Sequence, residues 1–376
     1  QPWILERRLP PQLPWLLTAW SRLATSTREA STDATWPGYL PAVAWRKQAA
    51  DRSGRRTADA GLRRPSLTGM VPDTPANEVA SVDEVVSALY DQDYLADEGL
   101  ATAIYLALRL RRPLLLEGEA GVGKTEVARA LASWTGGELI RLQCYEGLDA
   151  SQAVYEWDYS RQLLHLRAAE ATGATAQAEV ADLEDELYDE RFLVRRPLLR
   201  SLVAPSGIPP VLLIDEVDRA DDEFEAFLLE ILSDYAVTVP EVGTFRAEIP
   251  PVVVITSNRT RDVHDALKRR CLYHWVQHPD VDREVEILRV RAPHVPAALA
   301  RDVATVAAEL RDMGLYKPPG VAETLDWAEA LVLVGVDDLD ETAMEFTIGT
   351  LLKYREDQDR LRSRGFGEVV GLLRGA

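Results

Sequence analysis

The sequence lacks the features that mark membrane-spanning, disulfide-stabilised and zinc-binding proteins. It has no run of 18 apolar residues, so we expect no membrane span. Its two cysteines, Cys144 and Cys271, allow at most one disulfide, and we expect both thiols to be reduced and buried. The five histidines show no spacing typical of zinc ligands. His274 and His278 are four residues apart, but they fall in an expected strand and its exit.

Basic residues are also in the minority. The 376 residues include 42 Lys and Arg against 61 Asp and Glu, which gives a net charge of −19. Such a surface as a whole disfavours nucleic acid as a partner, although a local basic channel is compatible with it. Residues 1–70 hold 11 Lys and Arg against 5 Asp and Glu. The net charge of this segment is +6, which leaves a net charge of −25 for residues 71–376. This difference indicates two physically different segments.

The first 75 residues are expected to form a disordered or non-native extension. Residues 1–70 contain five of the nine tryptophans, many prolines and no methionine before Met70, and they show no sustained periodic pattern. The apolar stretch 13–20 faintly resembles a signal peptide, but it is short and broken by Pro14. One interpretation is translated upstream sequence, with the true start near Met70 or Val71.

A glycine-rich octapeptide is the most informative segment of the chain. It reads G-E-A-G-V-G-K-T and matches the phosphate-loop pattern G-x-x-x-x-G-K-[ST]. The apolar run 113–116 before it predicts a buried strand, and the spacing over 126–134 predicts a helix. We expect Lys124 to reach the β- and γ-phosphates of a nucleotide and the Thr125 hydroxyl to ligate Mg²⁺. A glycine-rich turn that matches by chance is the alternative. The expected binding residues are Gly118, Glu119, Ala120, Gly121, Val122, Gly123, Lys124 and Thr125.

Two carboxylates follow an apolar run, and the first of them, Asp215, lies 91 residues after Lys124. Val211–Ile214 predicts a buried strand, and Asp215 and Glu216 come directly after it. Ligands of open α/β sheets bind beyond the carboxyl ends of the strands. We therefore expect Asp215 in the outer shell of Mg²⁺ and Glu216 as the group that polarises an attacking water. Helix N-capping is the alternative, since a helix is expected from residue 223.

A second apolar run, 252–256, leads to Asn258 in the same way. If its strand lies beside the Asp215 strand, the Asn258 amide is placed to hold the attacking water against the γ-phosphate. An ordinary asparagine in a turn is the alternative.

Two arginines, Arg269 and Arg270, close the segment A-L-K-R-R-C at the end of an expected short helix. Exposed arginines usually belong to the solvated surface. Lys124 already serves the nucleotide of its own subunit, so this pair is the candidate for inserting a cation into the site of an adjacent subunit, where such a residue contributes about 10³–10⁵ in rate.

Apolar strands that alternate with helices predict a parallel sheet covered on both faces. The expected domains are an α/β nucleotide-binding domain over 76–279, with a helical insertion near 145–205, and a small all-α domain over 280–376. Strands are expected at 114–116, 137–142, 209–214 and 252–256, helices at 82–90, 96–111, 126–134, 223–235, 281–290, 297–313, 320–334 and 341–362, and a hairpin at 236–250 around Gly243. The acidic stretch 168–190 predicts a solvated helix, with an insertion for partner contact as the alternative.

Together these segments resemble the AAA+ ATPases of the MoxR family, over residues 78–365. The resemblance is carried by the phosphate loop and by L-L-I-D-E-V-D-R-A (212–220), I-T-S-N-R-T-R-D (255–262) and A-L-K-R-R-C (266–271). Y-E-W-D-Y-S-R-Q-L-L-H-L-R (155–167) and K-P-P-G-V-A-E-T-L-D-W-A (317–328) look most similar to the branch associated with carbon monoxide dehydrogenase maturation.

The resemblance implies a cytoplasmic homo-oligomer, a hexameric ring, that binds ATP and Mg²⁺ at its subunit interfaces. Lys124, Thr125, Asp215, Glu216 and Asn258 would come from one subunit, with Arg270 or Arg269 from the next. Family members remodel client proteins, here a metalloenzyme, often with a partner that carries a von Willebrand factor A domain.

One departure from the wider AAA+ pattern concerns the all-α lid. Many AAA+ proteins have an arginine at the start of a lid helix that senses the γ-phosphate. The corresponding segment, 318–323, has no arginine, and Lys317 is a poor substitute.

Three other functions fit a phosphate loop. A phosphotransferase is disfavoured because Glu216 beside Asp215 suits activation of water, and a GTPase because the sequence has no [NT]-K-x-D element. A nucleic-acid-associated AAA+ motor is disfavoured by the balance of −25 over residues 71–376.

Overall fold

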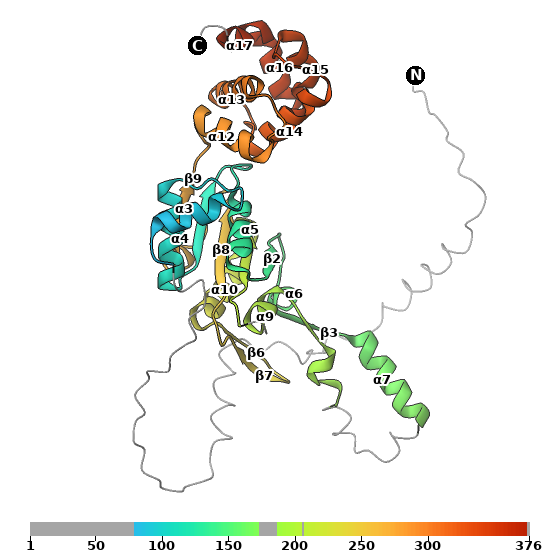
Figure 1. Cartoon of the computed structure of the whole chain (residues 1–376). Coiled ribbons are helices and arrows are strands. Elements are labelled where there is room, and N and C mark those ends of the chain that lie inside the picture. Colours follow the sequence, from blue (N-terminus) through green and yellow to red (C-terminus); the bar gives the residue numbers. More distant parts are fainter. Residues whose placement is uncertain (1–78, 173–185, 205–206, 374–376) are drawn as a thin grey trace, which may run out of the picture. The chain divides into compact units, whose positions relative to one another are not determined.

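The computed structural model describes residues 79–172, 186–204 and 207–373 (Figure 1). The expectations for the extension over 1–75 and for the middle of the acidic stretch, 173–185, lie outside these residues. The described part is a parallel five-stranded sheet with flanking helices, followed by a helical region, which confirms the predicted fold class.

The sheet has the strand order β2-β5-β8-β1-β9, and neighbouring strands are parallel. Its strands are β1 (Leu114–Gly118), β2 (Leu139–Gln143), β5 (Val211–Asp215), β8 (Val252–Ser257) and β9 (Leu272–Val276). β1 and β2 follow each other in the sequence but are not neighbours in the sheet, because β5 and β8 lie between them. The carboxyl ends of all five strands share one edge, where ligands of open α/β sheets bind.

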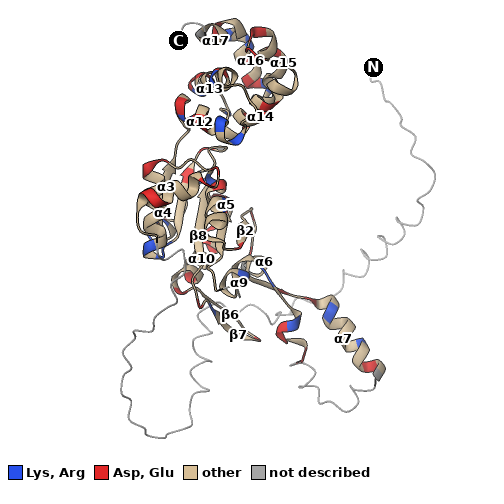
Figure 2. Cartoon of the chain, in the orientation of Figure 1, with Lys and Arg blue, Asp and Glu red and all other residues tan. Residues whose placement is uncertain are grey.

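Alternation along each strand supplies two separate cores, because successive side chains point to opposite faces of a sheet. On one face, Leu114 and Leu213 pack with the helices α3 (Val82–Tyr90), α4 (Glu98–Leu110) and α5 (Lys124–Thr135). On the other face, Leu115 and Leu212 pack with α6, α9, α10 and α11. These four helices are α6 (Ala150–Val154), α9 (Pro197–Leu202), α10 (Asp222–Asp234) and α11 (Asp265–Lys268). In Figure 2, β8 carries no charged residue, whereas α4 and the helix α7 (Tyr159–Thr172) carry charges of both signs.

Two small hairpins extend from the α/β region. The predicted hairpin is confirmed as β6 (Ala236–Val239) and β7 (Gly243–Arg246), in antiparallel pairing. The other, β3 (Tyr155–Trp157) with β4 (Leu193–Arg195), was not predicted because its strands are only three residues long. The helix α7 (Tyr159–Thr172) and the 3₁₀ turn η3 (Glu190–Phe192) lie between these two strands in the sequence. Trp157 is buried and meets Tyr155 and Tyr188 edge to face, so it anchors the packing of this insertion.

The C-terminal region is wholly helical and packs around the fully buried Trp327. Its helices are α12 (Val281–Arg291), α13 (Ala297–Asp312), α14 (Val321–Leu333), α15 (Glu341–Leu351), α16 (Arg355–Arg364) and α17 (Phe366–Leu373). The prediction of one helix over 341–362 is wrong. The chain leaves the helix at Leu352, which has φ −105° and ψ 113°, and α16 begins only at Arg355.

None of the helices in the described part of the chain is long and apolar enough to cross a lipid bilayer.

Candidate active site

A cavity of about 670 Å³ opens at the carboxyl edge of the sheet, beside the phosphate loop. The loop residues Ala120 to Thr125 line it, as do Arg141, Asp215, Glu216 and Asn258. The helical region contributes Arg283, Ile287, Arg291, Val321, Ala322 and Leu325. The structure therefore places most of the residues predicted from the phosphate-loop, Asp215 and Asn258 segments around one space.

The phosphate loop needs its glycines at specific points. Gly121 and Gly123 have φ of +81° and +91°, a region that favours glycine. A Cβ on Gly118 would lie 2.3 Å from the carbonyl oxygen of Val276, so a side chain does not fit there. Because α5 begins at Lys124, the N–H groups of Lys124 and Thr125 have no acceptor within the helix, an arrangement that suits an anion.

Lys124 is folded back onto its own loop. Its ammonium donates hydrogen bonds to the carbonyl oxygens of Gly118 (2.9 Å) and Glu119 (2.5 Å). Burial lowers the pKa of Lys124 to about 8, and the nearby carboxylates Asp218, Asp215 and Glu216 oppose that shift. The group is therefore still charged at neutral pH, and two backbone carbonyls hold it at the mouth of the loop.

Asp215, at the end of β5, connects three elements. The hydroxyls of Thr125 (3.1 Å) and Thr256 (2.5 Å) donate to its Oδ1. Arg141 on β2 donates to its Oδ2 from Nε (3.0 Å) and from Nη2 (2.5 Å). Thr125 and Asp215, which the sequence analysis expects to hold Mg²⁺, are thus joined by a direct hydrogen bond. Hydroxyl and carboxylate oxygens of this kind suit Mg²⁺.

Glu216 has a strained backbone and two amide partners. Its φ is +56°, an unusual value for a residue with a side chain, and its N–H donates to Thr256 Oγ1 (2.9 Å). Asn258 Nδ2 donates to its Oε1 (3.1 Å), and Gln143 Nε2 donates to its Oε2 (3.0 Å). Arg219 Nε lies 2.9 Å from the same Oε2. The amides hold the carboxylate at the edge of the cavity.

The loop after β8 is held by a second buried carboxylate, Asp218. It accepts hydrogen bonds from the N–H of Asn258 (3.1 Å), the N–H of Thr260 (2.8 Å) and the hydroxyl of Thr260 (2.7 Å). Burial by itself would raise the pKa of Asp218, but these hydrogen bonds outweigh it and lower the pKa. The sequence analysis assigned no role to Asp218, although it fixes the position of the Asn258 loop.

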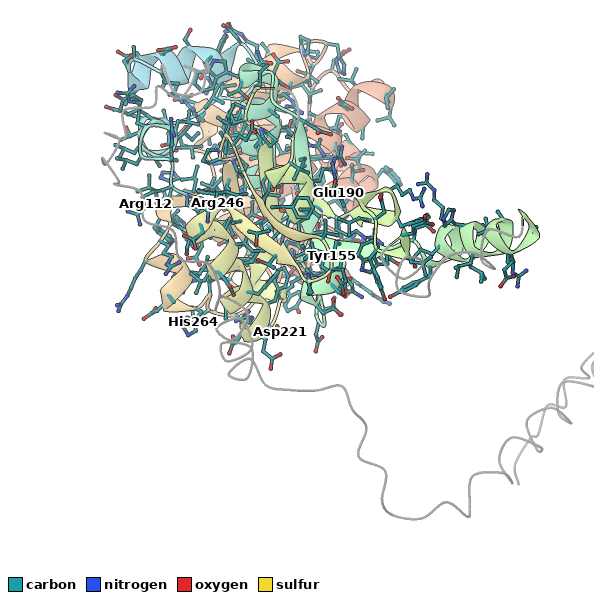
Figure 3. All side chains as sticks on the ribbon, turned by 90° about the horizontal axis from the view of Figure 1, so that it is seen from below. Arg112, Tyr155, Glu190, Asp221, Arg246 and His264 are labelled. Atoms are coloured by element: carbon teal, nitrogen blue, oxygen red, sulfur yellow. The ribbon has the colours of Figure 1, made fainter. Side chains whose placement is uncertain are left out.

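Arg269 and Arg270 follow α11, are exposed, and do not line the cavity. Arg112 holds this turn by donating from Nε to Arg270 O (3.0 Å) and from Nη2 to Arg269 O (2.8 Å). Arg270 Nη1 donates to Leu229 O (3.0 Å). Figure 3 shows Asp221 and His264, which cap α10 and α11, at one edge of the protein. The two arginines are therefore presented on a braced turn, away from the cavity of their own chain.

Glu117, the residue before the phosphate loop, joins β1 to the segment that carries these arginines. Its side chain is almost fully buried, and Tyr273 OH donates to its Oε2 (3.1 Å). Lys268 Nζ lies 3.4 Å from Oε1, and Arg259 Nε lies 4.0 Å from Oε2. One carboxylate thus faces cations from both the Asn258 loop and α11.

The helical region contacts the phosphate loop through the backbone. Val321 N–H, in the first turn of α14, donates to Gly121 O (2.9 Å), and a Cβ on Gly320 would lie 2.6 Å from Gly121 Cα. Glu323 accepts from Gly320 N–H (3.1 Å) and so caps α14. The segment 318–323, which has no lid arginine, therefore contacts the phosphate loop through the first turn of α14.

Two arginines of α12 also line the cavity. Arg291 Nη1 lies 3.1 Å from Glu126 Oε1 on α5, whereas Arg283 Nη2 is buried with no hydrogen-bond partner among the described residues. An unpartnered buried donor beside a cavity suits an anionic ligand. The sequence analysis missed these two residues. It looked for a lid arginine at 318–323, at the start of α14, whereas both arginines lie on the earlier helix α12.

The two histidines that are four residues apart meet different partners. His274 Nε2 lies 4.0 Å from Asp97 Oδ2, and His278 Nε2 lies 3.1 Å from Glu119 Oε2. Burial lowers the pKa of His278, and its hydrogen bond to Glu119 opposes that shift.

Comparison with known proteins identifies the region around this cavity. Residues 113–271 match the family model of the AAA domain (dynein-related subfamily). Among solved structures, the chain is similar to a crystal structure from Cytophaga hutchinsonii described as a "putative ATPase", with a TM-score of 0.40 and 13% identity, over 78% of this chain and 93% of that one. No curated protein matches the chain in sequence. The chain contains an AAA domain, and all the predicted site residues from Gly118 to Arg270 fall within it.

Proposed function

We propose that this protein is a Mg²⁺-dependent ATPase of the MoxR type that works as an oligomeric ring. The observation that carries the proposal is the gathering of Lys124, Thr125, Asp215, Glu216 and Asn258, from three parts of the sequence, at the carboxyl edge of one sheet. A cation, a hydroxyl with a carboxylate, and a carboxylate with an amide are the groups that hydrolysis of a phosphate anhydride requires.

The chain's own groups fit a magnesium nucleotide. The loop N–H groups and Lys124 would hold the phosphates, and the ammonium would exchange two carbonyl partners for phosphate oxygens. Thr125 and Asp215 would hold Mg²⁺, which neutralises the charge that develops on the phosphates. Two observations support this assignment. The phosphate loop leaves no room for a Cβ at Gly118, and Arg283 Nη2 is a buried donor without a hydrogen-bond partner among the described residues.

Glu216 is the proposed base and Asn258 its positioning partner. The hydrogen bond from Asn258 Nδ2 orients the carboxylate, and both side chains line the cavity. Glu216 would accept a proton from the attacking water, and the Asn258 amide would fix the water's position.

Arg270, or Arg269, would complete the site of a neighbouring subunit. Both are exposed on a turn that Arg112 holds, and neither reaches the cavity of its own chain. A cation supplied by a second copy would stabilise the charge that develops on the transferring phosphoryl group.

The proposed role of hydrolysis is the remodelling of a client, a metalloprotein, by a hexamer together with a von Willebrand factor A partner. The MoxR-like segments 155–167 and 317–328 support this assignment, as does the insertion formed by β3, α7 and β4. The alternatives are a nucleic-acid-associated motor and a phosphotransferase. Strong stimulation of ATPase activity by DNA would favour the motor, and phosphate transfer to an added hydroxyl compound would favour the phosphotransferase.

Two variants, Lys124→Ala and Arg270→Ala, test the nucleotide site and its completion by a neighbouring subunit, first separately and then mixed. Lys124→Ala should lower ATP affinity at least about 100-fold, because the loop loses its cation. Lys353→Ala, which removes an exposed lysine of the helical region, should leave affinity unchanged. Binding is measured by calorimetry and turnover by phosphate release.

Arg270→Ala by itself should bind ATP normally and hydrolyse it slowly. Mixed with Lys124→Ala, it should regain turnover, because a Lys124→Ala subunit still offers Arg270 to its neighbour. Normal ATP binding by Lys124→Ala would refute the phosphate-loop assignment. Absence of recovery in the mixture, repeated with Arg269→Ala, would refute action between subunits.

A further inference from the structure

Arg141 occupies a position in the cavity that the proposed ATPase mechanism does not use. It lies on β2, its side chain is 49% exposed, and its guanidinium reaches across to the end of β5. Nε and Nη2 both donate to Oδ2 of Asp215, at 3.0 and 2.5 Å. A cation is therefore held on the carboxylate that the proposed function assigns to Mg²⁺.

The two oxygens of Asp215 have different partners. The hydroxyls of Thr125 and Thr256 both donate to Oδ1, whereas Oδ2 receives its described hydrogen bonds from Arg141. A metal ion with its waters would compete with Arg141 for Oδ2, because two cations on one carboxylate oxygen repel each other.

Arg141 is also linked to the second carboxylate of the site. Its Nη2 donates to Gln143 Oε1 (2.5 Å), and Gln143 Nε2 donates to Glu216 Oε2 (3.0 Å). Arg141 and Gln143 lie two residues apart on β2, so their side chains share one face of the strand. Movement of Arg141 therefore alters the hydrogen bonding of both Asp215 and Glu216.

We propose that Arg141 is a further nucleotide-contacting residue, which holds Asp215 until Mg²⁺ arrives and then binds the terminal phosphate. The proposal rests on the proposed ATPase function. Guanidinium stays protonated at any pH the protein meets and bonds phosphate oxygens through two parallel N–H groups, so a released Arg141 needs a new anion. The terminal phosphate of a bound triphosphate would supply one in the same cavity.

The affinity for a triphosphate relative to a diphosphate tests this role. Calorimetry would measure binding of a non-hydrolysable ATP analogue and of ADP, each with Mg²⁺ and with EDTA, to the wild type, Arg141→Ala and Arg141→Lys. Arg200→Ala is the matched control, because Arg200 forms an exposed ion pair with Glu138 and does not line the cavity. Thermal unfolding establishes that each variant is folded.

In Mg²⁺, Arg141→Ala should bind the ATP analogue about 10-fold more weakly and ADP within about twofold of the wild type, since one charge-assisted contact to the terminal phosphate is lost. Arg141→Lys should lose about threefold for the analogue, because it keeps the charge without the paired donors. It also tests the proposal should Arg141→Ala fail to fold. In EDTA, the wild type and Arg141→Ala should differ less, because Arg141 then stays on Asp215.

Equal losses for the analogue and for ADP would show a fixed support for Asp215 and would overturn the inference. So would unchanged affinity for both nucleotides. A wild type that bound neither nucleotide would overturn the proposed function as well, so the two failures are distinguishable.

Discussion

The α/β region and the helical region both bury charged side chains, but they use them differently. In the α/β region, Lys124 and Asp215 are buried at the rim of the cavity, where a ligand can replace their present partners. In the helical region, Glu284 is paired with Arg311 (2.6 Å), and Asp357 accepts two backbone N–H groups; none of the three lines that cavity. Buried charge by itself therefore does not mark a functional site. A cavity beside the charge is the second requirement.

The largest expected effect is on the rate of ATP hydrolysis, which a substitution in the α/β region should lower and a matched substitution in the helical region should not. Glu216→Gln should reduce ATP hydrolysis by about 10²–10⁴-fold, because the amide cannot accept the proton of the attacking water, while ATP binding is kept. Glu345→Gln, an exposed change on α15, should have no effect. Phosphate release and nucleotide binding would be measured on the same preparations. Normal turnover by Glu216→Gln would remove Glu216 from the role of base.

A stability change is expected from the corresponding substitution in the helical region. Asp357→Ala leaves the partly buried N–H groups of Tyr316 and Lys317 without their acceptor, which costs about 2–4 kcal/mol of unfolding free energy. Asp359→Ala, which removes two exposed ion pairs nearby, with Arg355 and Arg362, should cost less than about 0.5 kcal/mol. Urea unfolding gives both values. ATP affinity of the folded Asp357→Ala protein should equal that of the wild type; a large loss would place Asp357 in the functional machinery.

The smallest expected effect lies where the two regions meet. The Cβ of Gly320→Ala would press on Gly121 Cα, so it should separate α14 from the phosphate loop. Overpacking of this kind costs about 1–2 kcal/mol, which corresponds to about 5–30-fold in ATP affinity. The control is Gly349→Ala, because its Cβ would have only an ordinary contact, at 3.8 Å from Gln358 Nε2. Equal ATP affinity for Gly320→Ala and the wild type would show that the backbone contact does not influence nucleotide binding.

Much of the fold followed from local patterns. The strand, loop and helix around Gly118–Thr125 were predicted because a phosphate loop requires that order, and the apolar runs before Asp215 and Asn258 indicated buried parallel strands. The break at Leu352 was missed, because neither proline nor glycine stands at it. Arg141 and Gln143 were missed because, in sequence, β2 is an ordinary half-exposed strand.

The sequence by itself determined that a phosphate loop, two strand-end carboxylates and an asparagine exist on an α/β fold, since each depends on residues adjacent in the chain. Tertiary structure alone decided which distant residues join them. The order β2-β5-β8-β1 places Arg141 against Asp215, and packing of α14 places Val321 against Gly121. Such pairs depend on strand order and helix packing, which form only when the cores on both faces of the sheet and within the helical region are buried together.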